Sequence, residues 1–229
     1  MLDMGDRQTA LLALTLLVPA ASIGIIAGLY VAPGSWGQKL SLLCQVWLLV
    51  FPIAWSVFVD RKKLCLALPK RLELLAGSIW GIFMFAVIVG IYSLFGQQWI
   101  DPVVAKEKSH QLGISSPTIY LIVEAYFVLV NSLIEEFTWR WFVCNKCQIL
   151  IPGTKAIFLS SLFFTIHHIF VIAAYSDWQA VILGSLAVFA AGIIWSQSYL
   201  TYRSLWPSYI SHAIADLALA TIGWHILFN

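Results

Sequence analysis

Seven long apolar runs constrain this chain more than any other feature of its sequence. They cover residues 10–32, 40–59, 72–95, 117–143, 155–174, 179–200 and 207–228. A helix needs about 20 mostly apolar residues to cross a bilayer, and each run meets that length. Since none of the runs alternates polar and apolar residues with a period of two, the pattern predicts helices rather than the strands of a barrel.

The composition supports a membrane location. Hydrophobic residues make up 61% of the 229 residues and charged residues only 10%, against about 25% charged residues in soluble domains. A soluble domain of this size has too little interior for so much apolar surface, and a disordered chain would leave it in water. The net charge of +2 argues against a nucleic-acid partner. We predict an all-α, polytopic transmembrane bundle of about seven spans, eight with a further re-entrant segment, in a single membrane domain over 1–229.

The distribution of Lys and Arg predicts the orientation of the bundle in the bilayer. With the N-terminus in the cytoplasm and seven spans, ten of the 13 basic residues fall on the cytoplasmic side: Arg7, Arg61, Lys62, Lys63, Lys70, Arg71, Arg140, Lys146, Lys155 and Arg203. Lys39, Lys106 and Lys108 fall on the far side. By the positive-inside rule, the N-terminus is cytoplasmic and the C-terminus lies on the far side.

Ionisable residues inside spans carry most of the functional information, because each is costly in lipid unless it is solvated or paired. The first three spans contain almost none. The last four contain Glu124, Glu135, Glu136, Arg140, His167, His168, His212 and Asp216. We therefore divide the chain into variable N-terminal spans (1–116) and a catalytic helical core (117–228).

Helix geometry sorts the charges of the fourth run. Glu136 and Arg140 are four residues apart, so they share a helix face and can form an ion pair. Glu135 is turned away from that pair and is free to face a cavity. At about 100° per residue, Asn131 lies one turn from Glu135, and Glu124 returns to nearly the same face.

Residues on the next helices are expected to meet Glu135. Glu135 lies 17 residues before Pro152 and His168 lies 16 after it, so an antiparallel hairpin places the two at a similar depth. The last run carries His212 and Asp216 on one face, four residues apart. Such a set suits water activation, in which a carboxylate takes a proton while imidazoles orient the water, hold a metal or stabilise an oxyanion.

Three short motifs in this region resemble a known family. Residues 135–140 read E-E-F-T-W-R and fit E-E-x-x-x-R, residues 164–168 fit F-x-x-x-H, and residues 212–216 fit H-x-x-x-N/D. In this order on successive membrane helices, they resemble the CPBP intramembrane proteases. That family includes the Rce1-type CAAX prenyl endopeptidases and proteins labelled abortive-infection or bacteriocin-immunity factors. His167 also fits the second motif when it is counted from Phe163, and we favour His168.

The resemblance implies roles for the matching residues. Glu135 would be the general base, His168 would orient the water or bind a metal, and His212 and Asp216 would complete the site, with Glu136 and Arg140 supporting it. Many family members have Asn where this chain has Asp216. An ionised Asp would repel an oxyanion, so Asp216 is expected to be a metal ligand, an orienter of His212, or protonated. The family has been interpreted both as zinc-dependent and as metal-free, and a zinc set here would be Glu135, His168, His212 and Asp216.

The sequence thus predicts an intramembrane endopeptidase that cleaves a membrane-anchored or prenylated substrate. Two other classes remain open. Intramembrane Glu, His and Asp also build the proton relays of transporters, although no inverted repeat is detected here. A non-catalytic immunity or scaffold member of the same fold would tolerate Glu135→Ala without loss of phenotype.

Overall fold

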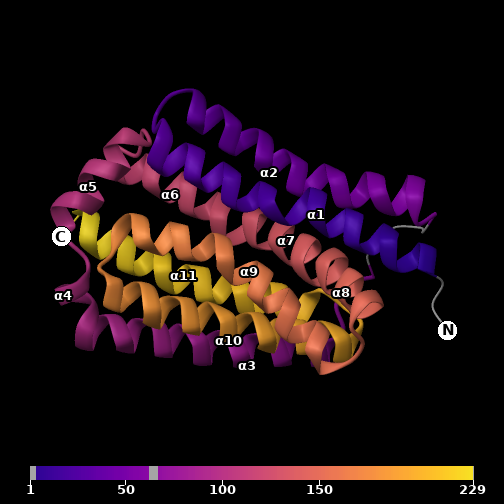
Figure 1. Cartoon of the computed structure of the whole chain (residues 1–229). Coiled ribbons are helices and arrows are strands. Elements are labelled where there is room, and N and C mark those ends of the chain that lie inside the picture. The colour runs from indigo at the N-terminus through magenta and orange to yellow at the C-terminus, as the bar shows by residue number, and fades with distance from the viewer. Residues whose placement is uncertain (1–3, 62–66, 229) are drawn as a thin grey trace.

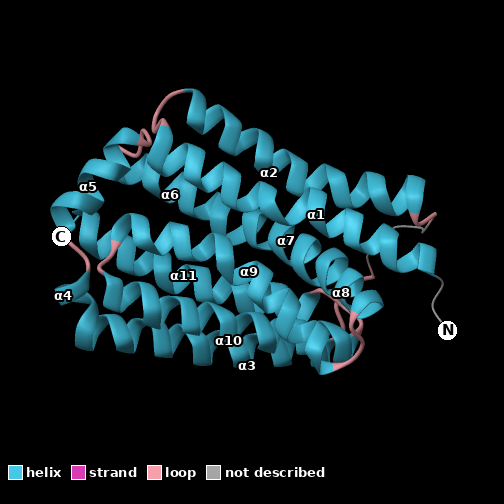
Figure 2. Ribbon diagram, viewed as in Figure 1, coloured by secondary structure: helices cyan, strands magenta, loops and turns pink. Residues whose placement is uncertain are grey.

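The described part of the chain, residues 4–61 and 67–228 of a computed structural model, is built from helices joined by short loops (Figure 2). Lys62 and Lys63 of the basic cluster lie outside these residues. The α-helices are α1 (Met4–Ile26), α2 (Trp36–Ala54), α3 (Arg71–Ile91), α4 (Gln97–Trp99), α5 (Pro102–Gln111), α6 (Pro117–Tyr126), α7 (Ser132–Glu136), α8 (Asn145–Leu150), α9 (Thr154–Tyr175), α10 (Trp178–Tyr202) and α11 (Trp206–Phe228). Wider π-helical segments are η1 (Ala27–Val31), η2 (Trp55–Val59), η3 (Tyr92–Gly96), η4 (Phe127–Asn131) and η5 (Phe137–Cys144).

Joined end to end, these helices form seven segments long and apolar enough to cross a membrane within the described residues. They are Met4–Val31, Trp36–Val59, Arg71–Gly96, Pro117–Leu150, Thr154–Tyr175, Trp178–Tyr202 and Trp206–Phe228. The seven predicted spans are confirmed, and the protein is a polytopic helical bundle. Helix α1 begins at one end of the bundle and α11 ends at the other, as an odd number of spans requires (Figure 1).

Apolar side chains face outward over most of this bundle. Leu42, Leu43, Ile82, Ile122 and Leu186 are each at least 60% exposed. Water would penalise such a surface, whereas lipid tails solvate it. The bilayer is therefore the solvent that this exterior fits.

Small residues bring pairs of helices close together. A side-chain carbon added to Gly77 or Gly81 would lie within 2.9 Å of atoms on α11, and one added to Gly24 would lie 2.8 Å from Cys44 on α2. Accordingly α3 packs along α11 and α1 along α2. The two small-xxx-small pairs, Gly24/Gly28 and Gly77/Gly81, thus serve packing within one chain.

The hairpin between α8 and α9 turns where the sequence indicates. Helix α8 ends at Leu150, and α9 begins at Thr154 after Gly153, whose φ is +80°. This backbone conformation favours glycine because a Cβ would be strained there. The hairpin sets α9 against η5, and α11 packs against α7 (Figure 1).

Candidate active site

The candidate site begins on the fourth membrane segment, where α-helical and π-helical turns alternate. Glu135 and Glu136 end α7, and this short helix lies between η4 and η5. π-Helical turns are rare and often occur at functional sites, because they change the direction in which side chains leave the helix. Here they set which residues face the interior of the bundle.

The predicted ion pair between Glu136 and Arg140 is present. Arg140 Nε donates to Glu136 Oε2 at 3.2 Å, and both side chains are fully buried. The guanidinium lies over the rings of Phe164 (4.3 Å) and Trp195 (5.3 Å), so aromatic faces on α9 and α10 add to its stabilisation. The pair anchors the helix that carries Glu135.

Glu136 also orients His212. The Nδ1 atom of His212 lies 2.9 Å from Glu136 Oε1, and the ring stacks on Trp195 with the centroids 4.2 Å apart. Because a carboxylate only accepts hydrogen bonds, His212 Nδ1 must carry the proton of this bond. The Nε2 atom is left to face the rest of the site.

Two further carboxylates approach His212 Nε2. Glu135 Oε2 lies 3.8 Å from it, and Asp216 Oδ2 lies 3.6 Å from it. Each carboxylate has its own hydrogen-bond donor: Asn131 Nδ2 donates to Glu135 at 3.0 Å, and Ser132 Oγ donates to Asp216 at 2.6 Å. Glu135, His212 and Asp216 therefore converge as the spacing predicts.

His168 joins the site from α9. Its Nδ1 bonds to the backbone oxygen of Phe164 at 2.9 Å, which makes Nδ1 the protonated nitrogen and leaves Nε2 as a free acceptor. A donor atom of His168, one of His167 and one of Glu135 all lie within 4.8 Å of one another. The arms of the hairpin thus bring residues 135 and 168 to the same depth.

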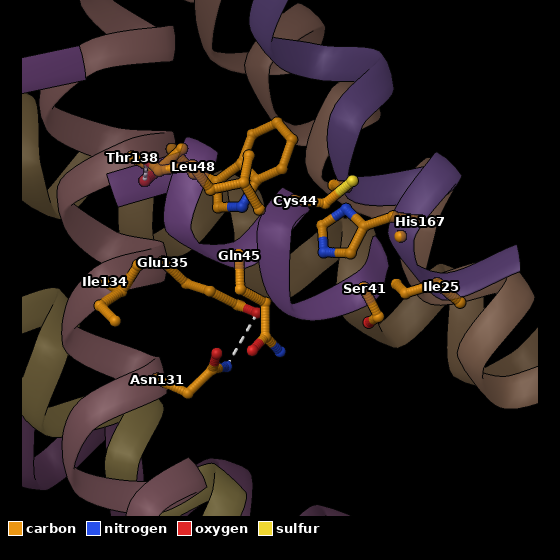
Figure 3. A pocket seen from close by; sticks show the side chains of 13 residues that line it. Ile25, Ser41, Cys44, Gln45, Leu48, Asn131, Ile134, Glu135, Thr138 and His167 are labelled. Atoms are coloured by element: carbon orange, nitrogen blue, oxygen red, sulfur yellow. Dashed lines mark hydrogen bonds between the residues drawn. The ribbon is translucent and has the colours of Figure 1, made fainter. Parts of the chain in front are cut away.

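A cavity of about 60 Å³ opens beside Glu135. A water molecule needs roughly 10–15 Å³ on this measure, so the space holds a few of them. One wall consists of Asn131, Glu135 and His167, and the opposite wall consists of residues on α1 and α2 (Figure 3). Gln45 points into the cavity together with Glu135 and Asn131 (Figure 3).

The α1–α2 wall was not anticipated from the sequence. Ser41, Cys44 and Gln45 carry no motif, and nothing in their spacing relates them to Glu135. The wall is joined to the site helix by Thr138, whose Oγ1 donates to the backbone oxygen of Leu48 at 2.7 Å. Residues 1–116 therefore contribute directly to the surroundings of the candidate base.

Two contacts of the site, and the place of Glu124, went beyond sequence reasoning. Ser132 lies three residues before Glu135 but bonds to Asp216 on another helix, and Trp195 stacks on His212 from α10. Glu124 is not among the residues that line the cavity. Since η4 lies between Glu124 and Glu135, the 100° step of an ordinary α-helix does not relate their faces.

The metal-ligating side chains that lie closest together are not the four residues that the sequence suggests as a zinc set. Within the described residues, the group able to hold a metal is Glu135, His167 and His168. His212 and Asp216 lie outside this group, and His212 Nδ1 is occupied by Glu136. Two imidazoles and one carboxylate fit a zinc ion chemically, with a fourth position open.

The fold and the site define a polytopic membrane protein with a buried cluster of carboxylates and imidazoles on α7, α9 and α11. Residues 116–218 match the model of the type II CAAX prenyl endopeptidase Rce1-like family. The matched segment is less than half of the chain, and it contains Glu135, Glu136, Arg140, His168, His212 and Asp216. Residues 1–115 lie outside the match. Comparisons with curated proteins and with solved structures gave no match.

Proposed function

We propose that this protein is an intramembrane endopeptidase that hydrolyses a peptide bond with water activated by Glu135. One observation carries the proposal: a carboxylate held by Asn131 borders a cavity of a few waters and lies 3.8 Å from His212 Nε2. A general base must lie within reach of its water and of the groups that stabilise the transition state. The match of residues 116–218 to the Rce1-like family model supports a CAAX-type protease.

In the proposed reaction, Glu135 accepts a proton from water, and the oxygen attacks the carbonyl carbon of the substrate. His168 accepts a hydrogen bond from the other O–H of the water through Nε2, since its Nδ1 is bound to the Phe164 backbone. His212, as an imidazolium held by Glu136, donates Nε2–H to the oxyanion. Glu135 then returns its proton to the leaving amine, which breaks the peptide bond.

Asp216 acts beside His212 in this proposal. With Ser132 donating to one of its oxygens, the carboxylate holds the charged His212 ring in place rather than contacting the oxyanion. Zn²⁺ is a Lewis acid, and when bound through Glu135 it would occupy the oxygen that accepts the proton in these steps. The steps above use only side chains of the chain itself.

The proposed substrate is a membrane-anchored or prenylated peptide that enters from the cytoplasmic half of the bilayer. The distribution of basic residues predicts a cytoplasmic N-terminus and a C-terminus on the far side. This orientation puts α8 and its buried Lys146 on the cytoplasmic side. A substrate with a lipid anchor would reach the site from the bilayer, where its anchor already lies.

Cleavage of a farnesylated CAAX peptide by the purified full chain tests the proposal. Glu135→Gln keeps the shape of the side chain but removes the base, so we expect the rate to fall about 10²–10⁴-fold. His168→Gln and His212→Gln should also lose activity, each through a different step. His110→Gln is the control, because His110 is exposed on α5, away from the cavity. Equal rates for the wild type and Glu135→Gln would overturn the general-base role.

A lack of cleavage by the wild type would have a different meaning from equal rates. Comparison of membrane proteomes with and without Glu135→Gln then identifies substrates of another sequence. If no protein differs between the two membranes, hydrolysis is wrong as the function. The non-catalytic member of the fold is the interpretation that such a result supports.

A further inference from the structure

His167 takes no part in the proposed hydrolysis, yet it lies at the centre of the polar cluster. It is 5% exposed and lines the same cavity as Glu135. Its ring stacks on Trp139 with the centroids 5.0 Å apart and the planes at 10°, which fixes the direction of the imidazole. Its Nδ1 is buried without a hydrogen-bond partner among the described residues. A buried polar atom of this kind is uncommon and calls for an explanation.

The neighbouring His168 is oriented as a metal-binding histidine usually is. His168 Nδ1 bonds to the Phe164 backbone oxygen at 2.9 Å, and histidines that bind metals usually donate their second ring nitrogen in this way. The two rings lie 4.1 Å apart between centroids. They therefore present imidazole nitrogens side by side toward Glu135.

The donor set selects a class of ion. Two imidazoles and one carboxylate suit Zn²⁺ and similar transition metals, whereas Mg²⁺ and Ca²⁺ prefer oxygen ligands alone. Bonds of about 2.0–2.1 Å in a tetrahedron separate the ligands by roughly 3.4 Å. The three donor atoms here lie within 4.8 Å of one another, so small side-chain rotations complete the site.

We propose that Glu135, His167 and His168 bind a transition-metal ion such as Zn²⁺, with His167 as the ligand that completes the set. His212 is not in this set, because the donor atoms that lie within 4.8 Å of one another in the described residues are those of Glu135, His167 and His168. The effect of the metal on activity rests on the proposed function of Glu135 as the general base. The Glu135 oxygen that binds a metal is withdrawn from accepting a proton, so metal-bound protein is less active.

Metal binding is measured on the purified full chain in detergent after removal of metals by a chelator. Co²⁺ should give the visible absorption of a tetrahedral nitrogen–oxygen site, and calorimetry with Zn²⁺ should give one ion per chain. We expect His167→Gln and His168→Gln to weaken binding by about 100-fold or more, since the loss of a ligand exceeds the 10–100-fold cost of losing an outer hydrogen bond. His212→Gln and His110→Gln should bind like the wild type.

Two results would overturn the site. One is the absence of Zn²⁺ and Co²⁺ binding by wild-type protein that keeps its helical circular dichroism. The other is a loss of binding in His212→Gln equal to that in His167→Gln, which would favour the set that includes His212. Both results are independent of any substrate.

The effect on activity is measured as the ratio of cleavage rates with and without Zn²⁺ for each variant. We expect Zn²⁺ to lower the wild-type rate, and a higher Zn²⁺ concentration to be needed for the same relative loss in His167→Gln. A higher rate with Zn²⁺ would overturn the competition between metal and base. If neither the wild type nor any variant cleaves the peptide, the comparison of membrane proteomes decides the proposed hydrolysis, while the binding measurements still decide the metal site.

Discussion

Replacing Arg140 with Met should destabilise the protein strongly, because the substitution leaves Glu136 charged in the interior. Both side chains are fully buried, and Arg140 Nε lies 3.2 Å from Glu136 Oε2. At an effective dielectric constant of about 20, two unit charges at this distance attract by about 5 kcal/mol. Removing one partner of a buried pair typically costs 3–5 kcal/mol.

The expected cost lies near the lower end of that range. His212 remains bonded to the other oxygen of Glu136 at 2.9 Å and compensates part of the lost charge. Met also refills much of the space beside the Phe164 and Trp195 rings, which the guanidinium now covers. About 3 kcal/mol corresponds to a shift of roughly 150-fold in the unfolding equilibrium.

Reversible unfolding in mixed detergent micelles measures this change, with Lys155→Met as the control because Lys155 is exposed. Glu136→Gln/Arg140→Met removes both charges and should be more stable than Arg140→Met alone, since neither charge is then left unpaired. A loss below about 1 kcal/mol for Arg140→Met would refute the reasoning. So would strict additivity of the two single substitutions.

Three further predictions concern packing and the cavity. Gly77→Val should lower the free energy of unfolding by about 1–3 kcal/mol, because its Cβ would meet α11 atoms at 2.8 and 2.9 Å. Gly90→Ala is the control and should leave the free energy of unfolding unchanged, because Gly90 has open space around it. Equal losses in the two variants would contradict this packing. Ser132→Ala removes the 2.6 Å hydrogen bond to Asp216, so we expect kcat to fall several-fold while the melting temperature changes little. An unchanged kcat would show that this bond does not position the Asp216 carboxylate. Gln45→Leu removes a polar group from the cavity wall and should raise KM about 3–10-fold, the equivalent of one hydrogen bond. An unchanged KM would show that Gln45 does not contact the substrate.

The spans could be predicted because length and hydropathy are local properties of the chain. The fourth run shows the limit of this reasoning: it was expected to end at residue 143, and the helical segment continues to Leu150. Polar residues follow Val143, which is why the apolar run ends there. Lys146 is nevertheless buried, because Asp60 on another segment pairs with it at 2.7 Å. Asp60, whose pairing with Lys146 allows the helix to extend, is distant in the sequence, and no sequence pattern predicts this pairing.

The candidate site was predictable to the extent that its residues follow regular helix spacing. Glu136 and Arg140 meet at four residues, and the equal arms of the hairpin bring His168 to Glu135. Glu124 does not line the cavity beside Glu135, from which η4 separates it along the chain. Contacts across helices, such as Ser132 with Asp216, depend on how segments rotate against one another. No spacing within one run encodes that rotation.

The cavity wall supplied by α1 and α2 separates two tasks along the chain. The residues proposed for chemistry lie within 116–218, whereas Ser41, Cys44 and Gln45 lie outside that segment. Substitutions on this face of α2 can therefore change which peptide fits while the proton-transfer groups stay in place. Under the proposed function, chimaeras that exchange the first two helices between relatives would retarget the proposed hydrolytic centre to new sequences. Selectivity and catalysis would then be separately adjustable parts of one membrane protein.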